Sequence, residues 1–89
     1  MSERRVAVAS AVGLHARPAS LFARAAAETG LLVTLTTMAG RTANAASILE
    51  VLSLGVGCGD IVTITAHGDG ADAALGMLVE VLSTDFDTT

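Results

Sequence analysis

The feature of this chain that most constrains its fold is a period of two in its apolar residues, the pattern of a β-strand that buries one face. Valines alternate with alanines over 6–9. Over 31–36 and 62–67 apolar residues alternate with a second set that is mostly threonine and also contains Leu32 and His67. Each segment has an apolar face and a smaller or Thr-rich face. Such strands suit an antiparallel sheet that packs helices on one side and meets water on the other.

Helical patterns lie between these strands. The first predicted helix runs over 16–28 and ends at a C-terminal cap with Gly30. A Ser-x-x-Glu capping box, formed by Ser47 and Glu50, predicts a short helix that stops near Gly55. In a capping box, the Glu side chain returns a bond to the backbone N–H of the capping residue.

A further short strand is predicted over 41–44, after an Ala39-Gly40 turn. The last helix is expected to be capped by Asp69, and it carries one apolar stripe: Leu75, Leu78, Val79 and Leu82. The order is βαββαβα. We expect one α+β domain over residues 1–89, with a four-stranded antiparallel sheet and its helices on one face.

Composition excludes several classes of function. The net charge is −4 and there is no Lys, so no basic tract could neutralise nucleic-acid phosphates. The apolar runs are too short to span a bilayer, and no signal-peptide core follows the N-terminus. A single Cys, Cys58, fits a reducing cytoplasm. His15, Cys58 and His67 are too scattered to predict a metal site, and His67 is expected to be a solvent-facing residue.

The segment 12–20 carries the chemistry. A Gly lets the chain turn, and His15 then stands just before a helix whose first turn contains Pro18. The free N–H groups and positive end of the helix dipole disfavour a cationic imidazole and favour a phosphoryl group attached to it. Arg17 offers a planar fork of donors for phosphate oxygens. The alternative is that His15 is simply a helix-capping residue.

The helix over 16–28 has two contrasting faces. Ala19, Phe22 and Ala26 lie on one side and are expected to face the sheet. The opposite stripe is bordered by Leu21, which we expect to be exposed, and consists of Arg17, Ser20, Arg24 and Glu28. A mixed charged and apolar face beside a His suits a protein partner.

Two stretches resemble the signatures of the HPr family, the histidine phosphocarriers of the bacterial phosphoenolpyruvate-dependent sugar phosphotransferase system. They are Gly-Leu-His-Ala-Arg-Pro-Ala at 13–19 and Asn-Ala-Ala-Ser-Ile-Leu at 44–49, followed by Leu-Ser-Leu-Gly at 52–55. The resemblance covers the whole chain. It implies an open-faced β-sandwich of four antiparallel strands and three helices.

The resemblance also implies the roles of individual residues. His15 would accept a phosphoryl group on Nδ1 from phospho-enzyme I and pass it to enzyme IIA domains, with Arg17 holding the phosphoryl in transfer. The protein would be a monomeric cytoplasmic carrier without a cofactor, and not a turnover catalyst. Its partner surface would comprise Ala16, Ser20, Leu21, Arg24, Ile48, Leu49 and Leu52.

Ser47 matches the serine that a kinase phosphorylates in many Gram-positive members, which links the family to catabolite regulators. Capping of the short helix by itself also accounts for this residue. Two positions depart from the family: Val12 replaces a small polar residue, and Ala46 replaces a Lys that often precedes the serine. The alternatives are a regulatory interaction module on the same scaffold and a carrier of the related nitrogen branch.

Overall fold

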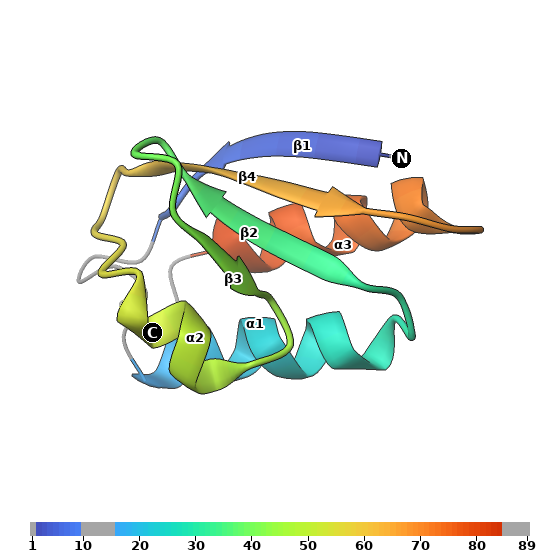
Figure 1. Ribbon diagram of the computed structural model, residues 1–89, viewed down its shortest axis with the longest axis horizontal. Helices are drawn as coiled ribbons and strands as arrows, with labels where there is room; N and C mark the ends of the chain where they lie inside the picture. Colours follow the sequence, from blue (N-terminus) through green and yellow to red (C-terminus); the bar gives the residue numbers. More distant parts are fainter. Residues whose placement is uncertain (1, 10–15, 85–89) are drawn as a thin grey trace.

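The architecture is a sheet with helices on one side, as Figure 1 shows for the computed structural model. The structure describes residues 2–9 and 16–84. In chain order the elements are β1 (Ser2–Ala7), α1 (Ala16–Glu28), β2 (Val33–Thr37), β3 (Thr42–Asn44), α2 (Ile48–Ser53), β4 (Ile61–Ala66) and α3 (Ala71–Leu82). The predicted order βαββαβα is confirmed, and the bounds of the first helix are those that the sequence predicts.

The four strands form one antiparallel sheet in the order β1-β4-β2-β3. Thr34 pairs with Thr65 and Thr36 pairs with Thr63 across β2 and β4, and all four side chains are half-buried. The alternate positions of the same strands are buried beneath the helices. The prediction of one apolar face and one Thr-rich face is therefore confirmed for the two central strands.

The core between sheet and helices is almost entirely aliphatic. Phe22 is the one aromatic side chain among the buried described residues. The other large side chains that are fully buried come from the strands and the helices alike: Leu35, Ile64, Leu75, Leu78, Val8, Val33, Val51 and Val62. Ala19 and Ala26 on α1 are also fully buried, so small side chains line the helix face that packs toward the sheet.

The boundaries of β1 and β2 differ from the sequence prediction. β1 begins at Ser2, not Val6, because all six of its residues pair with β4, including the charged run Glu3-Arg4-Arg5. Pairing of the backbone overrides side-chain pattern at this edge strand. β2 begins at Val33, since Leu32 lies outside the ladder and is 65% exposed.

The predicted cap of the last helix is wrong. The residue before α3 is Gly70, in the left-handed region at φ 80°, and no side chain bonds to the free N–H groups there. Asp69 lies one residue further out and is exposed. The tight turn that aims α3 across the sheet requires the left-handed conformation, which glycine adopts without strain. The apolar stripe is confirmed, with Leu75, Leu78 and Leu82 buried and Val79 packed against the core.

The corner between β3 and α2 is capped by Ser47, as predicted. Its Oγ accepts a hydrogen bond of 3.3 Å from the backbone N–H of Glu50. The reciprocal bond of the capping box is absent. The Ser47 N–H donates instead to the carbonyl of Asn44, and Glu50 Oε1 reaches past it to accept from the backbone N–H of Asn44 at 3.1 Å. Glu50 therefore clamps the end of β3 to the start of α2.

The cap predicts the effect of a substitution on stability. Ser47→Ala removes the acceptor for the Glu50 N–H and is expected to cost about 1 kcal/mol of unfolding free energy, or a melting temperature lower by about 4–8 °C. Ser47→Asn keeps a capping oxygen and is the matched control. Equal melting temperatures for wild type and Ser47→Ala would mean that this bond does not stabilise the corner.

Candidate functional site

The start of α1 presents a charged side chain on a fixed backbone. Arg17 is the second residue of the helix and is exposed, while Pro18 beside it is buried and sets φ in the first turn. His15, Val12 and the rest of 10–15 lie outside the described residues. In the sequence His15 directly precedes Ala16, the first residue of α1, and the first backbone N–H groups of a helix lack partners within it.

The two residues that follow β1, Val8 and Ala9, are held by backbone hydrogen bonds directly before the segment that contains His15. Val8 N–H donates to the carbonyl of Asp60 at 3.0 Å, and the Val8 carbonyl accepts from Gly59 at 2.8 Å. Ala9 N–H donates to the carbonyl of Leu82, at the end of α3, at 3.0 Å. Directly before residues 10–15, the backbone is therefore hydrogen-bonded to the loop that precedes β4 and to the end of α3.

The two faces of α1 are arranged as the sequence predicts, with one correction. Ala19, Phe22 and Ala26 are fully buried, and Arg17 and Arg24 are exposed. On the same stripe Ser20 is half-buried and Glu28 is exposed. Leu21 was expected to be exposed and is half-buried, because residues bordering the outer stripe of a helix still overlap the packed face. Of Ala16 only the backbone, as the first residue of α1, is described.

A second helix adds apolar surface beside α1. Ile48 and Leu49, in the first turn of α2, are 41% and 80% exposed, whereas Leu52 is half-buried and packs against the core. α2 contacts α1, and it lies next to the N-terminal part of that helix in Figure 1. The structure thus places the predicted apolar residues and the arginines of α1 on two helices that touch.

Two residues that sequence reasoning missed hold α2 in place. Asn44 uses its side-chain oxygen to accept from the N–H of Ala46 at 3.0 Å, a turn typical of Asn. Arg41 Nη2 donates to the carbonyl of Ser53 at 3.0 Å, where the last carbonyls of α2 lack partners. An Asn three residues before the capping serine is a weak signal for the first contact. No sequence pattern indicates the second.

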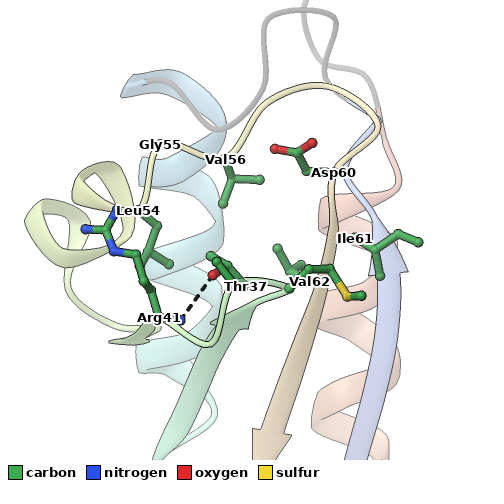
Figure 2. Close-up of a pocket in the computed structure, with 10 residues that line it drawn as sticks. Thr37, Arg41, Leu54, Gly55, Val56, Asp60, Ile61 and Val62 are labelled. Atoms are coloured by element: carbon green, nitrogen blue, oxygen red, sulfur yellow. Dashed lines mark hydrogen bonds between the residues drawn. The ribbon is translucent and has the colours of Figure 1, made fainter.

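A cavity of about 310 Å³ lies between the β2–β3 turn and the loop that leads into β4, and Figure 2 shows it. Leu54, Val56 and Val62 contribute apolar surface. The two charged side chains at its walls are already engaged, because Arg41 bonds to Ser53 and Asp60 Oδ2 accepts from the N–H of Gly57 at 2.8 Å. None of the described residues predicted for the site lines this cavity.

The remaining reactive side chains stand apart. Cys58 is a free, exposed thiol, and His67 is exposed just after β4. Within the described part of the chain, no three His, Cys, Asp or Glu residues gather as they would around a metal ion. Over the same residues, no helix combines the length and the apolar character that crossing a membrane requires.

Comparison with known proteins agrees with this arrangement. A family model described as the PTS HPr component phosphorylation site matches residues 2–84. A phosphocarrier protein HPr of Streptomyces coelicolor is 48% identical over 93% of this chain and 89% of its own length. A phosphocarrier protein NPr of Shewanella violacea is 36% identical, over 96% of this chain and 92% of its own.

Solved structures agree as well. A crystal structure of HPr from Thermoanaerobacter tengcongensis superimposes with a TM-score of 0.86 at 34% identity, covering 92% of this chain and 91% of that one. That fold is the open-faced β-sandwich that the resemblance implied, so this prediction is confirmed. Both signatures of the sequence lie inside the matched range. The chain therefore belongs to the HPr family of phosphotransferase-system phosphocarriers.

Proposed function

We propose that His15 is the phosphoryl acceptor of this carrier, taking the group from phospho-enzyme I and delivering it to enzyme IIA domains. The observation that carries the proposal is the match to the phosphorylation-site family model across residues 2–84. Such a carrier is a single cytoplasmic domain, and as a monomer it is substrate and product of its partner enzymes without turning over a substrate of its own.

The position of His15 supports this chemistry. In the sequence it directly precedes α1, and the unpaired N–H groups and the dipole at the start of a helix favour negative charge. Arg17, two residues further on and exposed, can reach phosphoryl oxygens with two donors. Because Val12 supplies no side-chain donor, backbone N–H groups and Arg17 carry more of the phosphoryl binding in this chain than in members with a polar residue there.

The surface around Arg17 supports binding of a protein partner. Arg24 is exposed two turns along α1, and Ile48 and Leu49 are exposed on the adjoining helix. A small apolar area flanked by arginines suits a partner with an apolar contact and acidic groups around it. Higher identity to the HPr of S. coelicolor than to the NPr relative favours the sugar branch over the nitrogen branch.

The acceptor can be tested by mass. His15→Ala is expected to take up no phosphoryl when mixed with a bacterial enzyme I, phosphoenolpyruvate and Mg²⁺, since its acceptor nitrogen is gone. His67→Ala keeps His15 and should gain one acid-labile phosphoryl, like wild type. Intact mass before and after acid treatment measures both. Acid-labile labelling of the His15→Ala protein would refute the assignment.

The two arginines are expected to act differently. Arg17→Ala removes a charge-assisted donor from the transferring group. It should lower the kcat of enzyme I, measured with this carrier as the substrate, by about tenfold or more. Arg24→Ala removes a charge that attracts an acidic partner from further away, so it should mainly raise KM. Steady-state transfer kinetics separate the two effects. A larger fall of kcat in Arg24→Ala than in Arg17→Ala would contradict this arrangement.

For Ser47 we propose phosphorylation by a serine kinase, with the modified protein read by catabolite regulators. A phosphate there adds nearly two negative charges beside the exposed Ile48 and Leu49. A partner that buries this apolar surface must then desolvate the charge or oppose it with its own acidic groups.

This regulation predicts slower transfer in a charged variant. Ser47→Asp should take phosphoryl from enzyme I more slowly than Ser47→Asn, which keeps a capping oxygen without the charge. The measurement is the initial rate of transfer at a fixed enzyme I concentration. If the two variants take up phosphoryl at the same rate, a charge at position 47 does not regulate transfer.

A further inference from the structure

A second group of exposed apolar side chains lies at the end of the sheet where β4 begins. Met38 and Ile61 are 70% and 45% exposed, although the next residue of β4, Val62, is buried. The register brings the group together, because Ala7 pairs with Ile61 and Met38 directly follows Thr37, the last residue of β2 to pair with β4. An apolar row therefore ends the face of the sheet that carries the threonines.

This row separates two hollows in the surface. One is the cavity of about 310 Å³ in Figure 2, where Arg41 lies on the side of α2 and Ile61 lies on the side of β4. The other has a volume of about 190 Å³ and is lined from β1 by Arg5 and Ala7. Met38 and Ile61 line both hollows. Together they form one sheet-end groove, which runs from Arg5 past Ala7, Ile61 and Met38 to Arg41.

Hydrogen bonds hold both walls of the sheet-end groove in place. In the β2–β3 turn, the N–H of Thr37 donates to the carbonyl of Arg41 at 2.8 Å, and the N–H of Gly40 donates to the carbonyl of Thr37 at 2.9 Å. Across the groove, just before β4, Asp60 Oδ2 accepts from the N–H of Gly57 at 2.8 Å. Walls that are already ordered lose little conformational entropy when a ligand binds.

The charges at the two ends of the groove define the chemistry of its ligand. Arg5 and Arg41 are two of the five basic residues in a chain of net charge −4, and both are exposed. Arg41 uses one donor on the carbonyl of Ser53, and a guanidinium group has several more. Asp60, which also lines the cavity, accepts from Gly57 within its own loop. An apolar centre with a cation at each end suits an apolar side chain between two carboxylates.

The strand order sets the spacing of those carboxylates. Arg5 pairs with Thr63, Thr63 with Thr36, and Thr36 with Thr42, which directly follows Arg41. Three steps between neighbouring strands therefore separate the backbones of the two arginines by about 14 Å. An extended peptide covers this distance in about four residues, and its alternate side chains point to the same side. The groove thus matches the pattern acidic-x-apolar-x-acidic.

We propose that the sheet-end groove docks an extended segment of a partner protein with the pattern acidic-x-apolar-x-acidic. None of the residues that define the groove belongs to the surface proposed for enzyme I and enzyme IIA. Docking here gives the carrier a partner other than the proteins with which it exchanges phosphoryl groups.

Titration of a synthetic peptide into the isotope-labelled full chain, followed by NMR, tests the site. The probe is acetyl-Ser-Glu-Thr-Leu-Thr-Glu-Ser-amide. It is expected to bind saturably with a Kd below about 1 mM and to shift the amide resonances of Met38, Arg41 and Ile61. A peptide with Gln for both Glu residues, and one with Ser for Leu, should each bind about fivefold more weakly or worse, since each lacks one kind of contact. Binding of the Glu peptide should weaken in 1 M NaCl.

Variants of exposed residues separate the groove from the arginine-bearing face of α1. Met38→Ser and Arg5→Gln each remove one contact without disturbing the core, and each should raise the Kd by about fivefold or more. Leu32→Ser and Arg24→Gln are the matched controls, because they remove the same kinds of group from exposed positions outside the groove, and they should leave the Kd unchanged.

Three results would overturn the proposal: no saturable binding of the probe, shifts confined to α1 and α2, or the same Kd for wild type, Met38→Ser and Arg5→Gln. None of these readouts depends on phosphoryl transfer, so they stand apart from the test of His15.

Discussion

The structure depends on the pairing of β4 with a strand on each side. β4 forms antiparallel ladders with β1 and with β2, and its inward residues Val62, Ile64 and Ala66 are almost completely buried. A slip of one residue would turn these three toward solvent and bury threonines in their place. The register of this one strand therefore fixes which face receives the helices, and with it the orientation of α1.

Backbone hydrogen bonds connect the sheet and α3 to the chain that leads to the candidate site. The loop before β4 and the end of α3 hold Val8 and Ala9, which lead toward His15. The buried face of α1, with Phe22 at its centre, turns Arg17 and Arg24 outward. The surface proposed to bind partners is thus made of exposed side chains. Their positions are set by buried residues of the same helices, which take no part in the chemistry.

The sequence predicts those features that arise from local pattern. The alternation of Val33, Leu35, Val62 and Ile64 with threonines is enough to identify the sheet face, and the burial of Phe22 follows from helix periodicity. The open-faced β-sandwich was predicted from the resemblance to two family signatures, because periodicity alone does not give the order of the strands in the sheet.

The sequence could not predict features that depend on contacts between distant segments. β1 extends back to Ser2 because β4 supplies a ladder for it, although charged residues give no strand pattern there. Glu50 bonds to the Asn44 N–H, whereas the Ser47 N–H that a capping box would offer donates to the Asn44 carbonyl within the β3–α2 turn. Arg41 reaches Ser53 across twelve residues, and only the folded hairpin creates that proximity. The role of His15 was proposed from the family signature and its place before α1.

The composition of the two outer strands bears on how this protein behaves at high concentration. An outer strand offers unpaired backbone groups that can recruit another chain into a growing sheet. On one side of this sheet the free border belongs to β1, whose Glu3, Arg4 and Arg5 would bring charges into any added ladder, and Arg4 is also tied to Asp72 on α3. On the other side β3 offers only three residues before the chain turns into α2. Both edges of the sheet are thus poor templates for the addition of a strand from another chain, although one face of the sheet is not covered by helices.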